Sequence, residues 1–409
     1  MLTDFFQKGD FSMIDFETEV VQTACAKIKV VGVGGAGGNT INSMMEAQSN
    51  GIEFIAANTD AQALELSKAH HTIQLGMKST KGLGTGANPE LGKRAAEEDI
   101  EKLLTHLEQA DVVFLTAGMG GGTGSGGLPI IAHALREKGI LTIAVVTRPF
   151  DFEGKRRASV AQEAIEKMRS EVDTLLILPN QKLLEVVDRQ VSMIDAFAMM
   201  NSVLNQSVKS IADIITKPGH INVDFADVRT IMKDTGLAVM GTGTATGEER
   251  AKEAALQAIT SPLLENMSIQ GAQGVLLNIT GGINLGLHEI SSAASIIYEQ
   301  ANENAIIILG SVIDESLTDQ VSVTVIATGF TEVDNKMMHK TAYIKDTKQE
   351  QKANTSDLKQ TETITIIKKE EEKIAEQSAV KSAKENYSLL DMDQIDIPAY
   401  WRQQQKSQE

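Results

Sequence analysis

Two glycine-rich runs are the segments of this sequence with the residue composition and spacing of a ligand-binding site. The longer run, at 118–127, follows the apolar residues 112–115 and precedes a pattern typical of a helix. An ordinary turn does not need so many glycines. A loop whose backbone N–H groups wrap around a phosphate does, because side chains would block the approach. The longer run therefore predicts a nucleotide-binding site.

The shorter run, at 32–38, allows a second interpretation. Its Gly32, Gly34 and Gly37 have the spacing of the dinucleotide fingerprint, and Asp60 lies at about the distance expected for a ribose contact. A NAD-dependent oxidoreductase would need only one such turn, however, whereas two amide-rich runs suit the greater charge of a nucleoside triphosphate. The remaining alternative is that the glycines only let a helix pack closely on a strand, which the entropic cost of the run at 118–127 disfavours.

The sequence lacks the P-loop motif with its phosphate-binding lysine. Backbone amides and a bound Mg²⁺ would therefore have to neutralise the phosphates. We expect that ion to be held mainly through the nucleotide, and we expect no metal site built from side chains.

The elements around the runs predict an α/β fold. Short apolar strands alternate with helices, which is the pattern of a parallel sheet covered on both faces. Strands are expected at 27–33, 53–57, 111–116, 140–147 and 174–178, and helices at 39–47, 89–109 and 128–137.

The second half of the chain predicts a long helix followed by a smaller domain. Apolar residues recur at three- and four-residue steps over 192–216, as in one amphipathic helix. Strands are expected around 237–242, 274–279, 305–308 and 320–328, and helices at 248–259 and 288–302.

After about residue 333 the composition becomes rich in Lys, Glu, Gln, Thr and Ser, which predicts a disordered linker. Apolar residues return near the end with Trp401, the single tryptophan. A tryptophan in such a tail favours a docking anchor for a partner, the alternative being that the tail packs back onto the folded part.

These patterns divide the chain into six parts. We expect a flexible arm at 1–26, a nucleotide-binding domain at 27–191, a connecting helix at 192–217, a C-terminal domain at 218–331, a disordered linker at 332–388 and a partner-binding peptide at 389–409.

Composition limits the location and the partners of the protein. The formal net charge of −17 over 409 residues argues against binding nucleic acid or an anionic membrane by charge alone. Cys25 is the single cysteine, so an intramolecular disulfide and a thiolate metal cage are excluded, which fits a reducing cytosol. No secretory signal and no membrane-spanning run are found, so we expect a cytoplasmic protein without direct membrane insertion.

The sequence GGGTGSG at 120–126 resembles the signature of the tubulin and FtsZ superfamily. Further matching segments, in the same order, are NTD at 58–60, GTGANP at 84–89, FEGKRR at 152–157 and NVDFADVR at 222–229. The resemblance covers nearly all of 27–330 and the tail. It implies a Rossmann-like parallel-sheet GTPase domain, a long central helix and a C-terminal α+β activation domain. It also implies a GTP-dependent polymerising protein that forms the division ring at midcell, on the inner face of the bacterial membrane.

The resemblance also assigns residues to GTP or GDP. The shorter run would form one phosphate loop, and the Thr123 hydroxyl would help the longer run to cradle the phosphates. Glu153 and Arg157 would contact ribose and phosphate. Without the resemblance, Arg157 would be interpreted as part of a solvated basic face. The full set is Gly34, Gly35, Ala36, Gly37, Gly38, Asn39, Gly86, Ala87, Asn88, Gly120, Gly121, Gly122, Thr123, Gly124, Ser125, Gly126, Glu153, Arg157, Asn180, Phe197 and Asn201.

Three of these residues would recognise the base. Asn180 and Asn201 would read guanine through their side-chain amides, and Phe197 would stack on the ring. Phe197 and Asn201 are four residues apart and so share a helix face. Without the resemblance, Phe197 would be interpreted as an aromatic residue of the core. The family often has an acid where Asn201 stands, so discrimination against other purines should be weaker here.

The segment at 222–229 has two interpretations. From the sequence alone, Asp224 is a helix N-cap and Asp227 an acid in the first turn. The resemblance implies instead that Asn222, Asp224 and Asp227 of one subunit complete the GTPase site of the next, where a carboxylate orients water. Head-to-tail contacts of this kind generate filaments. If Asp224 and Asp227 do not contribute to hydrolysis, the alternative is a non-catalytic adaptor that binds GTP.

The tail resembles the family's C-terminal peptide. That peptide binds membrane tethers and division regulators such as FtsA-, ZipA- and MinC-like proteins. The residues concerned are Asp396, Ile397, Pro398, Tyr400, Trp401 and Arg402. The family's usual aromatic–aliphatic pair is replaced here by Tyr400 and Trp401, which predicts a different partner preference.

Overall fold

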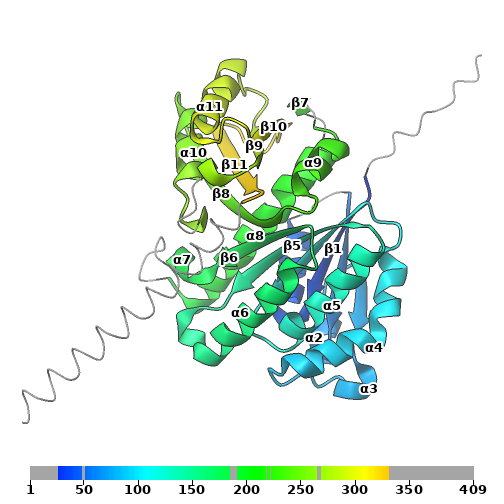
Figure 1. The fold of residues 1–409 in the computed structure, drawn as a ribbon. Coiled ribbons are helices and arrows are strands. Elements are labelled where there is room, and N and C mark those ends of the chain that lie inside the picture. The colour runs from blue at the N-terminus through cyan, green and yellow to red at the C-terminus, as the bar shows by residue number, and fades with distance from the viewer. Residues whose placement is uncertain are drawn as a thin grey trace, which may run out of the picture. The chain divides into compact units, whose positions relative to one another are not determined.

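A computed structural model describes residues 26–47, 51–184, 191–217, 219–221, 223–264 and 269–330. Within these ranges, eleven strands form one sheet in the order β3-β2-β1-β4-β5-β6-β8-β11-β9-β10-β7. The first six strands along the chain are all parallel to their neighbours. Figure 1 shows this parallel part surrounded by helices.

The parallel part contains the five expected strands with small changes in their bounds, and one further strand, β3. They are β1 (Ile28–Val33), β2 (Ile52–Asn58), β3 (His71–Gln74), β4 (Val112–Gly118), β5 (Leu141–Arg148) and β6 (Thr174–Pro179). All residues of β6 are buried, as are all but one residue of β4 and of β5. The expected α/β class is therefore confirmed, because only a sheet covered on both faces buries consecutive residues.

The helices of this part connect the strands. They are α1 (Gly34–Glu46), α2 (Ala61–Glu65), α3 (Met77–Thr80), α4 (Pro89–Leu107), α5 (Thr123–Glu137), α6 (Lys155–Arg169) and α7 (Asn180–Leu184), with the 3₁₀ turn η1 (Asp151–Glu153). Asn88 caps α4 by accepting a hydrogen bond from the Glu90 N–H (3.0 Å), and Pro89 occupies the first turn as expected.

The long helix predicted at 192–216 is confirmed as α8 (Met193–Thr216). Ser192 caps it by accepting a hydrogen bond from the Asp195 N–H at 3.2 Å. Leu204, Val208 and Ile211 of its apolar face are buried in the core. The helix contacts α1 and β5 in the first half of the sheet and β10 in the second, so it links both halves.

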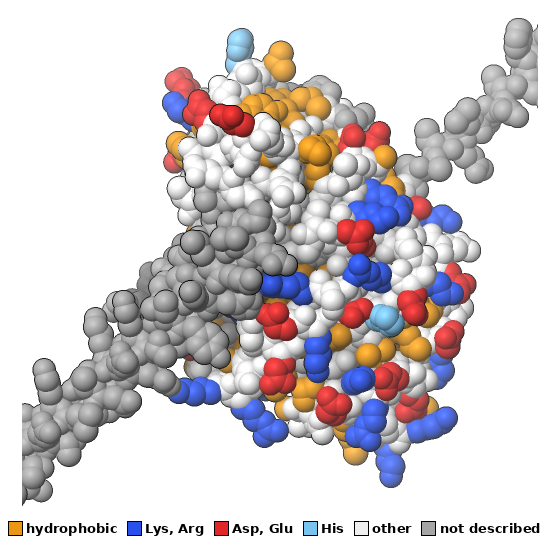
Figure 2. All heavy atoms as spheres, viewed as in Figure 1, with side chains coloured by type: hydrophobic (Ala, Val, Ile, Leu, Met, Phe, Trp, Pro, Cys, Tyr) orange, Lys and Arg blue, Asp and Glu red, His pale blue; other side chains and the backbone are white. Residues whose placement is uncertain are grey.

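The second half of the sheet is mixed. Its strands are β7 (Gly219–Ile221), β8 (Gly236–Thr246), β9 (Gly274–Gly281), β10 (Ile306–Ile313) and β11 (Gln320–Thr328). The helices are α9 (Phe225–Met232), α10 (Arg250–Ile259) and α11 (Leu287–Gln300), with the 3₁₀ turns η2 (Pro262–Leu264) and η3 (Ile269–Gly271). Figure 2 shows apolar side chains gathered on this half of the molecule.

The sheet is continuous between the two halves. Residues 174–176 of β6 pair in parallel with residues 236–238 of β8. This pairing was not predicted, because strand partners separated by about 60 residues leave no local pattern.

Three of the differences from expectation have a clear physical reason. Helix α1 begins at Gly34 and not at 39, so the shorter glycine run is itself the first turns of a helix. Helix α6 was not predicted because its buried stripe is weak, with Ala161, Ala164, Ile165 and Met168. Strand β3 was not predicted because Ile73 is its single buried residue.

Candidate functional site

The predicted nucleotide residues, together with the neighbouring Thr59 and Phe150, follow five neighbouring strands of the parallel sheet. Gly34 follows β1, Thr59 follows β2, the longer glycine run follows β4, Phe150 follows β5 and Asn180 follows β6. These strands stand in the order β2-β1-β4-β5-β6. Since parallel strands end at the same edge, the structure places these residues along one edge, where sheets of this class bind ligands.

The shorter run divides into glycines that are packed and glycines that are open. A Cβ at Gly32 would lie 2.4 Å from the Gly37 carbonyl oxygen, and a Cβ at Gly37 would lie 2.7 Å from that of Thr116. These two glycines therefore let α1 pack directly on β1 and β4. A Cβ at Gly35 or Gly38 would meet nothing within 4 Å. Gly35 lies in the first turn of α1, where backbone N–H groups have no partner inside the helix, and Gly38 lies one turn further along.

The longer run divides in the same way. A Cβ at Gly122 would lie 2.2 Å from the Thr85 hydroxyl oxygen, and one at Gly126 would lie 2.0 Å from the Pro89 carbonyl oxygen. The interpretation as close packing, which the sequence disfavoured, is thus correct for these two positions. At Gly121, by contrast, a Cβ would meet nothing within 4 Å. Gly35, Gly38 and Gly121 form the open glycines of the site.

A hydrogen bond between Gly120 and Ser125 fixes the backbone conformation of the longer run. Ser125 accepts a hydrogen bond from the Gly120 N–H at 2.9 Å, and Gly120 has a φ of +99°, which favours glycine. Gly124 packs near the Gly118 carbonyl oxygen, at 3.1 Å from its would-be Cβ. Helix α5 begins at Thr123, so the run leads into a helix N-terminus.

Three threonine hydroxyls meet beside the runs. The Thr123 hydroxyl lies 2.7 Å from that of Thr59 and 3.3 Å from that of Thr85, and all three residues are buried. The sequence drew attention to Thr123 alone. The signal for Thr59 and Thr85 was their place within the segments NTD and GTGANP, directly after a strand and beside a turn.

The turn at 84–88 has an unusual backbone. Gly84, Gly86 and Ala87 all have positive φ, of 79°, 56° and 59°. A left-handed alanine is uncommon and marks a strained position, which often belongs to a functional segment. Gly86, Ala87 and Asn88 are exposed and adjoin Thr85 of the hydroxyl cluster.

The ribose and phosphate residues predicted after β5 contact each other. Glu153 accepts a hydrogen bond from Arg157 at 2.5 Å and another from the Phe150 N–H at 3.0 Å. The Glu153 side chain is 16% exposed and that of Arg157 53%, so the pair stands at the surface. No described residue other than Glu153 forms an ion pair with Arg157.

The three base-reading candidates come from α7 and α8. Phe197 is 40% exposed and meets the buried ring of Phe150 edge to face, with centroids 5.5 Å apart. Asn201 accepts a weak hydrogen bond from the Thr40 hydroxyl at 3.4 Å, which ties α8 to α1. Asn180 is buried, and its Oδ1 has no hydrogen-bond partner among the described residues. A buried amide oxygen without a partner is costly unless a ligand donates to it.

The two candidate catalytic aspartates lie on α9. Asp224 caps this helix by accepting a hydrogen bond from the Asp227 N–H at 2.8 Å, so the role expected from the sequence alone is confirmed. Both aspartates are exposed. Asn222 and the tail residues Asp396, Ile397, Pro398, Tyr400, Trp401 and Arg402 lie outside the described residues.

Helix α8 separates the aspartates from the base-reading residues. Asn201 precedes the end of α8 at Thr216 by 15 residues, which corresponds to about 22 Å of helix. Beyond that end, Ile221 of β7 pairs with Ser311 of β10, and α9 packs on β9 and β10. The aspartates therefore belong to the second half of the sheet.

Other expectations have a structural outcome as well. Asp60 caps α2 by accepting hydrogen bonds from the Gln62 and Ala63 N–H groups, so its carboxylate already serves a helix. Within the described ranges, no three His, Cys, Asp or Glu side chains gather as a metal site. None of the helices in those ranges is long and apolar enough to span a membrane.

Two family models match the chain. The model for the GTPase domain of the tubulin/FtsZ family matches residues 27–188, and the model for the C-terminal domain of the FtsZ family matches residues 236–331.

Full-length relatives and solved structures agree with this assignment. The chain is 46% identical over 402 residues to the cell division protein FtsZ of Pseudomonas aeruginosa, covering 96% of the chain and 100% of the relative. It is 51% identical over 304 residues to that of Buchnera aphidicola, covering 74% and 79%. A solved structure of an empty FtsZ dimer from M. jannaschii superimposes with a TM-score of 0.73 at 44% identity, covering 75% of this chain and 89% of that one.

Proposed function

The chain belongs to the FtsZ family of tubulin-like GTPases, and we propose from this that it polymerises head to tail and hydrolyses GTP at a site shared by two subunits. It is a cell-division protein that binds guanine nucleotide and has GTPase activity. The proposal concerns how its residues divide this work.

The observation that carries the proposal is the separation along α8. Nucleotide-binding candidates line one edge of the parallel sheet, whereas Asp224 and Asp227 lie beyond the opposite end of a helix that is about 36 Å long. One chain therefore does not bring its own aspartates to its own nucleotide. A second chain stacked on the glycine runs would bring them there.

The first face binds the nucleotide. The open positions Gly35, Gly38 and Gly121 let phosphate oxygens approach backbone N–H groups at the N-termini of α1 and α5. Asn180 Oδ1 accepts an N–H of guanine, and the exposed Phe197 ring stacks on the base. Mg²⁺, bound mainly through the phosphates, would supply further positive charge.

The second face supplies catalysis. Asp224 and Asp227, with Asn222, orient the water that attacks the γ-phosphate of the neighbouring subunit. The contact between subunits is stabilised by bound GTP and also completes the site that hydrolyses it. Filaments assembled in this way therefore turn over. Contacts of this head-to-tail kind do not close on themselves, so they extend into filaments.

Exposed apolar residues near both faces support self-association. Leu83, beside the strained turn at 84–88, is 85% exposed. Ile283 and Leu287, at the start of α11, are 74% and 77% exposed. Apolar side chains exposed to this degree in both halves of the sheet suit burial against a second copy. The M. jannaschii relative has itself been solved as a dimer.

The tail would connect the filament to the division machinery. We assign residues 389–409 to membrane tethers and regulators of the FtsA-, ZipA- and MinC-like kinds, which would hold the filaments at midcell on the inner face of the membrane. This assignment rests on the resemblance of Pro398, Tyr400 and Trp401 to the family's C-terminal peptide.

The GTPase rate per molecule, measured against protein concentration with light scattering in parallel, tests the proposal. We expect a rate near zero below a threshold and a rise that coincides with scattering. A rate that is independent of concentration would mean a self-contained enzyme. Tight GTP binding without hydrolysis would instead favour the non-catalytic adaptor.

A further inference from the structure

A cavity lies away from the glycine runs. It has a volume of about 280 Å³ and is lined by Arg136, Gly139, Ile140, Leu141, Asp173, Arg229, Lys233 and Asp234. Leu141 is the first residue of β5, whereas the candidate nucleotide residues follow the last residues of the strands. The cavity therefore opens at the opposite edge of the sheet and is separate from the site described above.

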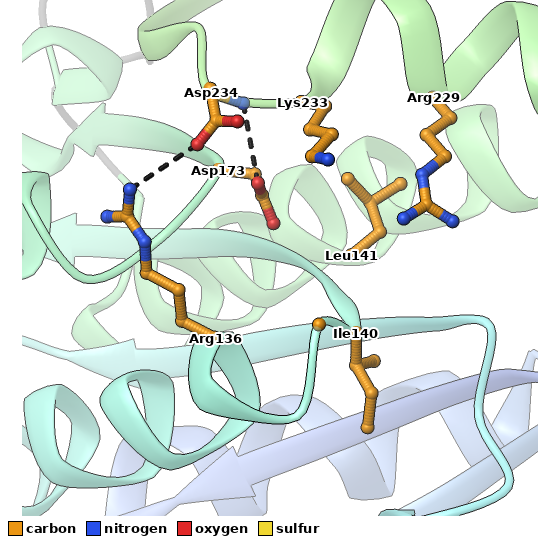
Figure 3. Close-up of a pocket in the computed structure, with 8 residues that line it drawn as sticks. Arg136, Ile140, Leu141, Asp173, Arg229, Lys233 and Asp234 are labelled. Atoms are coloured by element: carbon orange, nitrogen blue, oxygen red, sulfur yellow. Dashed lines mark hydrogen bonds and ion pairs between the residues drawn. The ribbon is translucent and has the colours of Figure 1, made fainter.

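One wall of this cavity carries two cations, Arg229 and Lys233. Arg229 lies in the last turn of α9 and Lys233 is the C-cap residue four positions later, so both side chains leave the same end of the helix. Figure 3 shows both side chains projecting from the helix toward Leu141. Among the described residues, neither side chain has an ion-pair or hydrogen-bond partner. Two like charges at one end of a helix repel each other unless an anion lies between them.

The two acids that line the cavity, Asp173 and Asp234, are already engaged. Asp234 accepts a hydrogen bond from Arg136 at 3.4 Å. Asp173, which is 8% exposed, accepts hydrogen bonds from the Thr142 N–H at 2.8 Å and the Asp234 N–H at 3.3 Å. Figure 3 shows the contacts of Asp234, which directly follows Lys233 in the chain, with Arg136 and Asp173. The acids thus hold the lining of the cavity together, and within the described part of the chain they do not pair with Arg229 or Lys233.

We infer that this cavity binds a small organic phosphate, with the phosphate between Arg229 and Lys233 and the carbon body against Leu141. A guanidinium and an ammonium together offer several donors to a dianion, and hydrogen bonds between charged groups are about twice as strong as neutral ones. Leu141 lines the cavity and its side chain projects between the two cations, so it provides an apolar floor, whereas the Ile140 side chain points away from them (Figure 3). This inference requires neither GTP hydrolysis nor assembly.

Calorimetric titration of the full-length, GDP-saturated protein tests this inference, because bound GDP keeps the probes out of the nucleotide site. The probes are inorganic phosphate and phenyl phosphate. We expect phenyl phosphate to bind more tightly than inorganic phosphate, since it also covers the apolar floor. We expect the double variant Arg229→Gln/Lys233→Gln to bind it at least about tenfold more weakly.

The control is Lys252→Gln, which removes an exposed cation from α10. It should bind phenyl phosphate like the unaltered protein, and circular dichroism should show that all variants are folded. Equal binding of phenyl phosphate by the double variant and the unaltered protein would overturn the inference, as would a failure of both probes to bind. If the two probes bound equally well, the site would be one for free phosphate and the assignment to an organic phosphate would be wrong.

Discussion

At the scale of single residues, the glycines of the two runs have two different roles. Gly122 and Gly126 allow α5 to approach the turn at 84–88 and α4, whereas Gly35, Gly38 and Gly121 leave open space. The sequence predicted a phosphate site from the number of glycines alone. It could not separate the two groups, because their difference depends on which backbone lies opposite each one.

The two kinds of glycine predict two kinds of alanine variant. Gly126→Ala places a Cβ 2.0 Å from a carbonyl oxygen of α4, so it should lower the free energy of unfolding by about 1–3 kcal/mol or more. Gly121→Ala should leave stability nearly unchanged and weaken GTP binding. Urea unfolding and nucleotide titration of both variants measure the two effects. Equal loss of stability in the two would contradict the division.

The unpartnered oxygen of Asn180 predicts a role in binding the base. Asn180→Ala should weaken GDP binding by about tenfold or more, since the ligand loses a buried hydrogen bond. Asn278→Ala is a matched control, because Asn278 in β9 is also buried with an unpartnered Oδ1 among the described residues but lies in the other half of the sheet. It should alter stability and leave nucleotide affinity unchanged. GDP affinity that is the same for Asn180→Ala and the unaltered protein would remove Asn180 from the site.

At the scale of elements, a buried arginine joins the helices of the second half. Arg250 of α10 is 5% exposed and donates to Glu289 of α11 at 2.7 Å and to Asp319 at 3.2 Å. The hydrogen bond from Arg250, together with one from the Gly286 N–H, holds the pKa of Glu289 below its ordinary value although burial opposes this. The pair thus stabilises the packing of α10 on α11.

The lowered pKa of Glu289 predicts sensitivity to acid. A carboxyl whose pKa is lower in the folded state stabilises the fold above its unfolded pKa, near 4.5, and this contribution is lost as the pH falls through the folded pKa. The free energy of unfolding of the unaltered protein should therefore decline below about pH 4.5 more steeply than that of Glu289→Gln. Chemical unfolding over pH 3 to 7, as an order-of-magnitude window, checks this. Parallel pH dependences for both proteins would exclude the contribution.

Long periodic elements are those that the sequence predicts well. Helix α8 was predicted to within one residue, because its apolar residues recur over 24 positions. Helix α6 was missed because alanines form much of its buried stripe. The start of α1 was missed because glycines are poor helix formers, and here tertiary packing on β1 decides.

At the scale of the whole molecule, one sheet joins the edge that carries the candidate nucleotide residues to the half that carries the candidate catalytic aspartates. The pairing of β6 with β8 and the contacts of α8 with both halves connect the two. This connection was not predictable from local pattern, since it pairs residues distant in the chain. We propose that its consequence is a filament in which every GTPase site belongs to two subunits.

Complementation between two inactive variants tests this claim most directly. Asp227→Asn keeps the nucleotide face and loses the catalytic segment, whereas Gly121→Glu puts a negative charge where phosphates would lie and keeps the catalytic segment. Each variant alone should hydrolyse almost no GTP. Mixed in equal amounts, they should regain up to about a quarter of the unaltered rate, because about one junction in four pairs two intact faces. A mixture as inactive as its components would contradict a site shared between subunits.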